Sequence, residues 1–322
     1  MRRQGQWSLS AQTDRGEMAS RARPLLLSAP GALLKLLDRH FAHLAVLPSL
    51  IVLLGIVGYP AAETFILSLQ RVRLGETSGT FVGFQNYLTA FSGPRFWNAL
   101  TNTLVFTAGT LSIELLASIP IALVLAKRFR GIVVFRGAVL LPYLLASVVV
   151  ATIWKWWLHD FVGLMNYVLL SIRVIQKPVV WLATLKLTMV VLILVSAWTR
   201  ISVVTLVLVG GLQTIPEEVH EAAAMDGANR WQHFFRITLP LLIPYILLAL
   251  ILRTTFAMRE FDLVWLLTEG GPLGSTDLIS TFTYRTAFTV FDAGYASALS
   301  FVLLLVTFTL SAAYVWFLAR SR

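Results

Sequence analysis

Residues 213–240 read QTIPEEVHEAAAMDGANRWQHFFRITLP, and this polar stretch links two long apolar runs, Leu187–Val209 and Leu239–Ala257. Each run is close to the ~20 apolar residues that a helix needs to cross a bilayer. Lipid offers no partner for a free backbone N–H or C=O group, so both runs are expected to be helices. The sequence therefore predicts a water-exposed loop between two membrane-spanning helices.

The first half of this loop carries the signals of a short helix. Thr214 is expected to cap it, with Glu217 three residues later completing a capping box. Pro216 is tolerated in the first turn, where its missing N–H would have no partner in any case. We expect the helix to run to about Met225 and to stop at Gly227, because glycine takes the left-handed capping conformation without strain.

A second short helix is expected after the bend, with Trp231, Phe234, Phe235 and Thr238 on one face. The first helix combines a smooth alanine surface, residues 222–224, with three neighbouring glutamates. Such a helix suits a groove on a partner protein. The alternative is an amphipathic helix on the membrane surface, although that kind of helix normally presents Lys or Arg rather than acids to the headgroups.

The same apolar pattern recurs along the chain. Hydrophobic residues make up 57% of the sequence and charged residues 13%, against about 25% charged residues in soluble domains. The predicted spans are Leu44–Leu69, Thr103–Leu125, Gly137–Trp157, Leu187–Val209, Leu239–Ala257 and Ser297–Leu318. The runs do not alternate as the strands of a barrel would. They predict an all-α integral membrane protein with six transmembrane helices, residues 43–322, preceded by a basic tail, residues 1–42, with room for a short interfacial helix.

Six spans place both termini on one side, and the distribution of basic residues indicates which. One side receives the basic tail, Lys127, Arg128, Arg130, Arg136, Arg320 and Arg322. The other side carries Arg71, Arg73, Arg95, Arg173, Lys177 and Lys186 together with the acids Glu76 and Asp160. Both termini are therefore expected in the cytoplasm, with the loop at 213–240. The net charge of +10 fits this surplus of basic residues on the cytoplasmic side. The sequence has no basic run interleaved with aromatic residues, the pattern that would indicate nucleic-acid binding.

The spacing in the loop resembles the "EAA" signature of ABC importer permeases. The matching positions are Glu221, Ala222, Ala223, Gly227, Ile237, Leu239 and Pro240. The fuller form, with Asp226, Ala228 and Pro244, is similar to the carbohydrate-uptake branch, to which the maltose importer belongs. Further resemblance lies in Phe81–Tyr87, Arg259–Asp262 and Thr268–Pro272. Family members often carry glycine where Glu269 stands.

This resemblance implies a type I ABC importer permease fold with a cytoplasmic coupling-helix loop. The loop would dock into a cleft on a separate ATP-hydrolysing subunit, where Glu221 would meet a basic residue. The implied docking residues are Glu217, Glu218, Glu221, Ala222, Ala223, Asp226, Gly227, Ala228, Phe234, Leu239 and Pro240. The implied assembly has a second permease chain, two ATP-binding subunits that hold ATP and Mg²⁺, and an extracytoplasmic solute-binding protein, all at the bacterial inner membrane and its lipid.

The sequence lacks the nucleotide-binding and zinc-protease motifs, and we therefore do not expect this chain to be an enzyme. No Gly-x4-Gly-Lys-Ser/Thr phosphate loop occurs in the sequence, and no His-Glu-x2-His pair offers zinc ligands. No cofactor, metal or catalytic residue is expected in this chain. Two other functions stay open at this stage. A gradient-driven secondary transporter would usually show inverted repeats with broken helices at matching positions. We find no such repeats in the sequence. A membrane assembly protein would leave the loop spacing as coincidence.

Ionisable groups at membrane depth are candidates for the solute pathway. Glu114 lies midway along the second span, Arg253 lies inside the fifth, and Arg259 and Asp262 follow near its outer end. One interpretation is that these side chains contact sugar hydroxyls. The other is that they form internal ion pairs, either Glu114 with Arg253 or Arg259 with Asp262. The residues leave both interpretations open.

Aromatic side chains are the other pathway candidates. Trp154 and Trp157 lie near the outer end of the third span, where tryptophan usually forms an interfacial belt, although a stacking platform for sugar rings is the alternative. Tyr143 is a weaker candidate. The basic residues of the outer loops favour either an anionic solute or an acidic binding protein. The predicted function is translocation of a sugar or oligosaccharide, acidic ones included, from a solute-binding protein into the cytoplasm.

Overall fold

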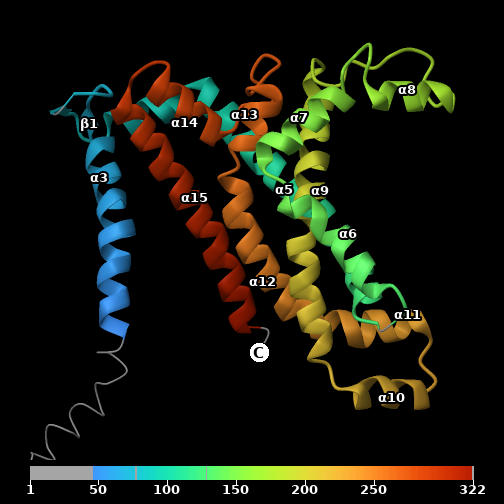
Figure 1. Cartoon of the computed structure of the whole chain (residues 1–322). Helices are drawn as coiled ribbons and strands as arrows, with labels where there is room; N and C mark the ends of the chain where they lie inside the picture. Colours follow the sequence, from blue (N-terminus) through green and yellow to red (C-terminus); the bar gives the residue numbers. More distant parts are fainter. Residues whose placement is uncertain (1–45, 77, 128, 321–322) are drawn as a thin grey trace, which may run out of the picture. The chain divides into compact units, whose positions relative to one another are not determined.

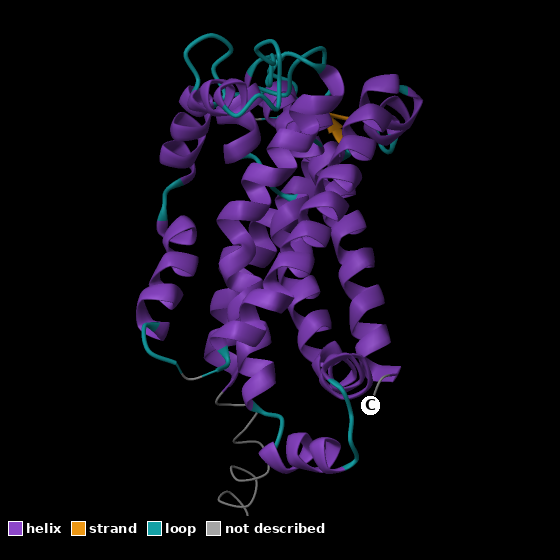
Figure 2. Cartoon of the chain, turned by 90° about the vertical axis from the view of Figure 1, so that its right-hand side faces the viewer, coloured by secondary structure: helices purple, strands orange, loops and turns teal. Residues whose placement is uncertain are grey.

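The computed structural model describes residues 46–76, 78–127 and 129–320, and Figure 2 shows that helices make up most of this part of the chain. The all-α prediction is confirmed. Within these residues, five helices are long and apolar enough to cross a membrane, or six if one bent pair counts as a single span. The predicted tail, residues 1–42, lies outside the described residues.

The spanning elements start and end within about five residues of the predicted runs, except at the outer end of α5 (Figure 1). They are Val46–Ser68, containing η1 (Leu54–Gly58) and α3 (Tyr59–Ser68); α5 (Pro94–Leu125); the pair α6 (Ile132–Leu144) and α7 (Ser147–Trp157); α9 (Leu185–Gln213); α12 (Leu239–Met258); and α15 (Ala293–Arg320). α5 begins at Pro94, earlier than the predicted Thr103, because the polar turn at its outer end is already helical.

Short elements join the spans. They are the antiparallel strands β1 (Gln70–Arg71) and β2 (Thr80–Phe81), and the helices α4 (Gln85–Ser92), α8 (Leu164–Ser171), α10 (Glu217–Met225), α11 (Arg230–His233), η2 (Phe234–Thr238), α13 (Asp262–Thr268) and α14 (Ile279–Phe288). In the strand pair, Gln70 lies opposite Phe81.

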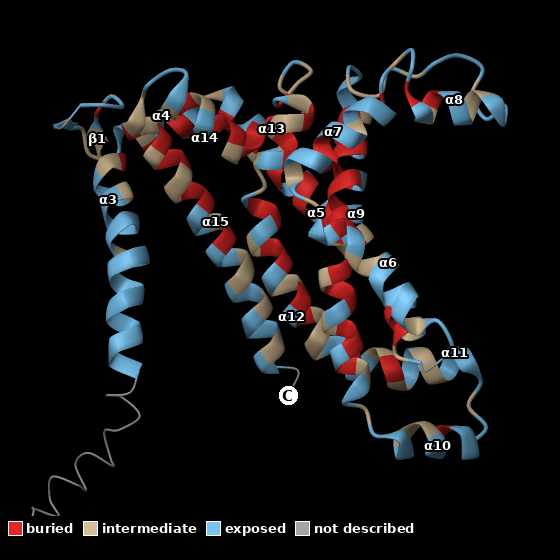
Figure 3. Cartoon of the chain, viewed as in Figure 1, coloured by how far each residue is buried: buried red, intermediate tan, exposed pale blue. Residues whose placement is uncertain are grey.

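The chain divides into two compact units, Met1–Ala62 and Glu63–Arg322. The most apolar window of the helix Val46–Ser68 has no buried residue, and Figure 3 shows this helix exposed along almost its whole length. A helix with apolar side chains exposed all round is what a lipid environment requires.

α5 and α9 form the centre of the second unit and carry many of its buried residues (Figure 3). Gly109 permits the close approach, because a Cβ atom there would lie 2.8 Å from Cδ1 of Ile193. The hydroxyl of Ser118 donates across the same interface to the carbonyl of Ile201, at 2.9 Å. Small residues and hydroxyls at the contact are how membrane helices pack without a hydrophobic driving force between them.

The predicted third span, Gly137–Trp157, is not one continuous helix, which corrects that prediction. α6 and α7 meet at an angle of 94°, because Leu145 and Ala146 take extended backbone conformations between them. Beyond the bend, Val150 and Ala151 are buried in the core cluster that α7 shares with α9 and α13. Tertiary packing thus overrides a run of apolar residues that would by itself favour one straight helix.

Candidate functional site

The predicted loop helix is α10, and it lies at the end of the second unit where α9 ends, opposite α8 and α13 (Figure 1). Its glutamates Glu217, Glu218 and Glu221 are all exposed. Of the three alanines only Ala223 is buried, so the outward surface of the helix is narrow and acidic. This is the shape and charge expected of a helix that enters a basic groove.

The start of α10 differs from the prediction. Pro216 occupies the capping position with an extended backbone, and no side chain caps the helix. The hydroxyl of Thr214 turns back instead, donating to the carbonyl of Gly211 at 2.8 Å and lying 2.8 Å from the hydroxyl of Tyr245. The Thr214–Glu217 capping box is therefore wrong: Tyr245 and Gly211 offer Thr214 better partners than the helix does. At the other end, Gly227 has a φ of +73°, as predicted.

The second helix of the loop is not a separate element. α11, η2 and α12 follow one another without a break, so the aromatic segment is the beginning of the fifth span. A capping box does occur here, between Asn229 and Gln232. The residues predicted to share one face of this helix do not do so. The rings of Trp231 and Phe235 stack with their centres 5.9 Å apart and are exposed, while Thr238 is buried. The π-helical turn η2 shifts the register of the side chains between them.

The remaining docking candidates lie in the same short stretch of chain. Asp226 is exposed and directly follows α10. The N–H of Ala228 donates to the carbonyl of Ala223 at 3.0 Å, which folds the chain back after Gly227. Phe234, Leu239 and Pro240 belong to the continuous segment above, with Phe234 and Leu239 partly buried and Pro240 exposed.

Two polar side chains predicted at membrane depth meet in the interior. Nε of Arg253 donates to Oε2 of Glu114 at 2.8 Å, and Nη2 donates to Oε1 at 2.6 Å. The side chain of Glu114 is fully buried and that of Arg253 is 4% exposed. This two-point contact joins α5 to α12, so one of the two interpretations left open for this pair, the internal ion pair, is the observed geometry.

Arg259 and Asp262 line a cavity of about 310 Å³, together with Phe256, Glu260 and Phe261 and with Arg200 of α9. Arg259 and Asp262 form no ion pair with each other in the described part of the chain. Nε of Arg259 donates instead to the carbonyl of Thr255, at 3.1 Å.

The charges around this cavity affect one another. Glu260 follows the end of α12, and burial raises the pKa of its carboxyl, while the positive charge of Arg200 acts in the opposite direction. Arg200 also lies over the ring of Tyr143, with its guanidinium carbon 5.8 Å from the ring centre. The cavity therefore combines aromatic faces with groups of both charges, which suits a polar ligand with apolar faces.

The two predicted tryptophans have different environments. Trp154 packs against the core cluster of α7, α9 and α13 and lies edge-on to Trp157 at 5.5 Å and to Trp198 at 5.7 Å. Trp157 is 42% exposed. Neither of them lines the cavity that holds Arg259 and Asp262.

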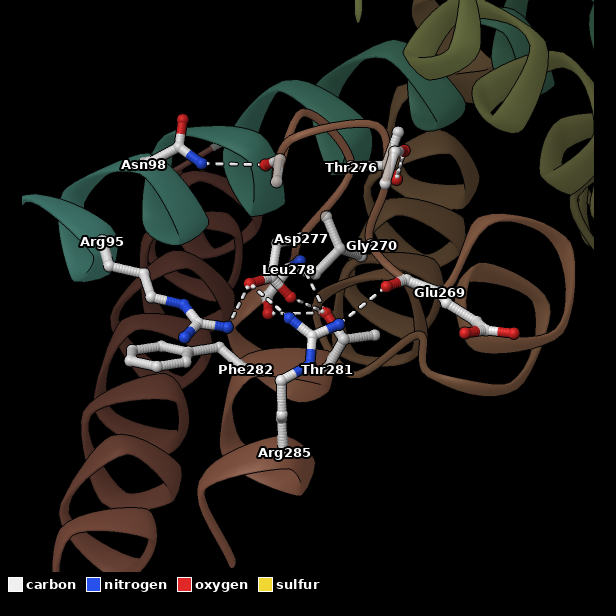
Figure 4. A network of polar contacts seen from close by, with 12 residues as sticks. Arg95, Asn98, Glu269, Gly270, Thr276, Asp277, Leu278, Thr281, Phe282 and Arg285 are labelled. Atoms are coloured by element: carbon white, nitrogen blue, oxygen red, sulfur yellow. Dashed lines mark hydrogen bonds and ion pairs between the residues drawn. The ribbon is translucent and has the colours of Figure 1, made fainter. Parts of the chain in front are cut away.

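A network of polar contacts lies at the end of the second unit opposite α10 (Figure 4). Oδ2 of the buried Asp277 accepts from Nη2 of Arg95 at 3.2 Å and from Nη1 of Arg285 at 3.4 Å. Thr281 donates to the other oxygen of this carboxylate at 2.8 Å. Nη2 of Arg285 also donates to the carbonyl of Glu269, at 2.7 Å. The network ties α5, α14 and the loop between α13 and α14 together.

The same network explains one difference from the resembling family. Glu269 has a φ of +52°, in the left-handed region that glycine adopts most easily. Its carboxylate points away from the network in Figure 4, while its carbonyl takes part in it. The backbone contact is thus independent of which side chain the position carries.

Several polar residues of these sites were not predicted. Arg200 lies inside an apolar run, and the rule that selected Glu114 and Arg253 should have selected it too. Asp277 and Arg285 carry no such signal, because they lie in short segments outside the spans. Their role depends on a partner, Arg95, that is 182 residues away from Asp277 in the chain.

The fold and the loop can be compared with known proteins. A protein family described as "binding-protein-dependent transport system inner membrane component" matches residues 118–322, which include α10 and every residue that lines the cavity around Arg259. The chain belongs to this family. It is a multi-pass component of the inner membrane, and its relatives are transporter permease subunits rather than enzymes.

Relatives of this permease span almost its whole length. The trehalose/maltose transport system permease protein of Thermococcus litoralis is 36% identical over 86% of this chain and 94% of the relative. The sulfoquinovosyl glycerol transport system permease protein of Agrobacterium fabrum is 34% identical over 86% of this chain and 90% of the relative. A solved bacterial ABC transporter involved in import of the acidic polysaccharide alginate contains a chain of the same fold, with a TM-score of 0.76 and 24% sequence identity. The match covers 90% of this permease and 99% of that chain.

Proposed function

We propose that this permease is a transmembrane subunit of an ATP-driven importer and moves a sugar or oligosaccharide into the cytoplasm. Its relatives named for sugar transport, and the match to a family of binding-protein-dependent transport components, support this function. A gradient-driven transporter or a non-transporting assembly protein is not favoured by these similarities. The solute would arrive on an extracytoplasmic binding protein, and a second permease chain would complete the membrane pathway.

The exposure of α10 carries the docking part of the proposal. Its three glutamates are exposed, and they form no ion pair with any described residue of this chain. We infer that they contact basic groups on a separate ATP-hydrolysing subunit. The complete transporter would contain two such subunits, and these would bind ATP and Mg²⁺. Closure of the two subunits would pull on α10 and bias the bundle between two states, as coupling requires.

The proposed orientation in the membrane rests on the basic residues at the end of the second unit that carries α10. Nη2 of Arg136, near the start of α6, donates to the carbonyl of Leu125 at the end of α5, at 3.1 Å. Leu125 at the end of α5, Arg136 near the start of α6 and Gln213 at the end of α9 are among the residues that line one cavity there, so the basic turn between α5 and α6 and the loop after α9 share one side. We infer from the positive-inside rule that this side is the cytoplasm, and from the number of spans that both termini lie there.

The cavity lined by Arg200, Phe256, Arg259, Glu260 and Asp262 is the proposed contact with solute. Sugar rings have apolar faces that suit aromatic side chains and hydroxyls that suit charged hydrogen-bonding groups. The arginines there, and the exposed basic residues of the outer loops, favour acidic sugars as a second candidate. Uptake of a neutral oligosaccharide and of a uronate oligosaccharide, each with its binding protein, distinguishes the two classes of solute.

Charge reversal at Glu221 tests the docking role. The complex is purified through a tag on this permease, and retention of the ATP-hydrolysing subunit and its stimulation by loaded binding protein are measured in liposomes. Loss of a desolvated charge contact predicts about 30-fold weaker association, or more, for Glu221→Lys. Glu269→Lys, the same change on an exposed acid at the opposite end, is expected to retain the subunit. Equal retention in both variants contradicts docking through Glu221.

A further inference from the structure

Two imidazoles link α10 to the segment that follows it. Nδ1 of His220 lies 2.8 Å from Nε2 of His233, and the ring centres are 4.9 Å apart. His220 is in the middle of α10 and His233 ends α11, so this contact crosses the turn at Gly227. Both side chains are partly buried.

Little else holds α10 in place. Ala223 is its single buried residue, and its glutamates form no ion pair among the described residues. Within the part of the chain that the structure describes, the imidazole contact is the one side-chain hydrogen bond between α10 and another element. Because α11 continues into α12, this contact lies on the direct path from the docking helix to the spanning bundle.

The protonation of the pair decides whether the contact exists. A hydrogen bond between two ring nitrogens needs one donor and one acceptor. When both rings are charged, Nδ1 of His220 and Nε2 of His233 are both donors, so the bond is lost and two cations face each other. Imidazole is the side chain that ordinarily changes charge between about pH 5 and 8.

The surroundings offer the pair no strong compensating charge. Glu217 and Glu221 lie within one turn of His220 on α10, and Arg230 and Arg236 lie three residues to either side of His233. None of these groups forms an ion pair with either ring among the described residues. The remaining polar neighbour is neutral: Oγ1 of Thr238 lies 3.4 Å from Nδ1 of His233.

We propose that His220 and His233 are positioning residues that brace the docking helix against α11 through a single shared proton. The brace transmits movement of α10 to α12 while one ring stays neutral, and it opens when both rings are charged. The proposal rests on the docking function proposed for α10. It adds that coupling between ATP hydrolysis and transport weakens as the cytoplasmic side is acidified.

The test compares pH profiles of the complete complex in liposomes. The readout is the ratio of hydrolysis with and without loaded binding protein. For the native permease this ratio is expected to fall about tenfold from about pH 7.5 to about pH 5.5, the range in which histidine ordinarily changes charge. The double variant His220→Asn/His233→Gln replaces the two nitrogens by amides that can still hydrogen-bond but do not titrate. It should couple at neutral pH and lose the acid decline.

Each control separates the brace from a general structural role. His220→Ala is expected to couple weakly at neutral pH, near the level that the native permease reaches at about pH 5.5, and the Asn/Gln pair to restore coupling at neutral pH. The titrating groups of the partner subunits are common to all variants, so only the difference between profiles is interpreted. Identical acid declines in the native and Asn/Gln forms overturn the proposal.

A distance measurement keeps the proposal falsifiable if the double variant fails to assemble. The chain has no cysteine, so spin labels attach only at the introduced pair Glu218→Cys and Phe235→Cys, both exposed positions. The distance distribution should broaden at about pH 5.5 relative to about pH 7.5 in the otherwise native permease. An unchanged distribution overturns the brace. A change in distance alongside normal coupling of Glu221→Lys would leave the brace standing and reject the docking function instead.

Discussion

The carboxylates of Glu114 and Asp277 are buried and each meets arginine, whereas the carboxylates of α10 are exposed and meet no cation among the described residues. The first group joins helices far apart in the sequence: Glu114 joins α5 with α12, and Asp277, which precedes α14, joins α5 with α14 through Arg95 and Arg285. The second group joins nothing within the described chain. Acidic residues thus have two separate uses in this permease, one internal and one directed outward.

The difference follows from solvation. A buried carboxylate without a partner is strongly unfavourable, so it persists only where a donor is fixed beside it. An exposed carboxylate keeps its water until a partner replaces that water. The contrast predicts that substitutions in the first group act on stability and substitutions in the second act on assembly.

The largest expected effect is at the Glu114–Arg253 pair. Glu114→Ala leaves the guanidinium of Arg253 buried without a counter-charge, and it should lower the free energy of unfolding by about 3–5 kcal/mol. The measurement is SDS-induced unfolding of the complex in lipid–detergent micelles, followed by helix content. The double variant Glu114→Leu/Arg253→Met removes both charges and is expected to recover most of the loss. A double variant as unstable as Glu114→Ala would mean that the pair is not the source of the effect.

A smaller loss of stability is expected at Asp277. Asp277→Asn keeps the shape and one acceptor oxygen but removes the charge shared by Arg95 and Arg285, so the free energy of unfolding should fall by about 2 kcal/mol. The loss is smaller than at Glu114 because the side chain of Arg95 is 50% exposed and water replaces part of the contact. The same unfolding assay measures it.

Asp292→Asn is the matched control, since Asp292 lies at the same end of the second unit and accepts from the N–H of Tyr295 without an ion pair in the described chain. It is expected to change the free energy of unfolding by less than about 0.5 kcal/mol. Equal losses at Asp277 and Asp292 would show that the two arginines contribute nothing beyond an ordinary hydrogen bond.

The sequence could predict what depends on local composition and spacing. The apolar runs gave the spans, and Gly227 gave the end of α10, because both signals lie within a few residues. The option of a Glu114–Arg253 pair could also be named in advance, because ionisable groups inside spans need partners. The docking role of the loop stays a prediction that rests on its motif and its exposure.

What the sequence could not predict depends on contacts between distant residues. The bend at Leu145 and Ala146 follows from packing of α7 against α9 and α13, which no run of apolar residues encodes. The two arginines around Asp277 meet only once α5 and α14 are in place. Thr214 failed as a cap for the same reason, since Tyr245, its alternative partner, is 31 residues further along.

The smallest expected effect on stability is at Glu218, and it tests the other half of the contrast. Glu218→Gln removes one exposed charge from α10 and should change the free energy of unfolding by less than about 0.5 kcal/mol. Its effect should appear in assembly instead. Because an exposed ion pair is screened by salt, retention of the ATP-hydrolysing subunit by the native permease should decline as ionic strength rises. In Glu218→Gln the decline should be shallower, since one charge pair fewer is screened. Unfolding and salt dependence measured on the same preparation decide the matter. A loss of stability as large as that expected for Asp277→Asn would place Glu218 among the internal carboxylates, whereas an unchanged stability with an unchanged salt dependence would mean that Glu218 faces solvent in the assembled transporter.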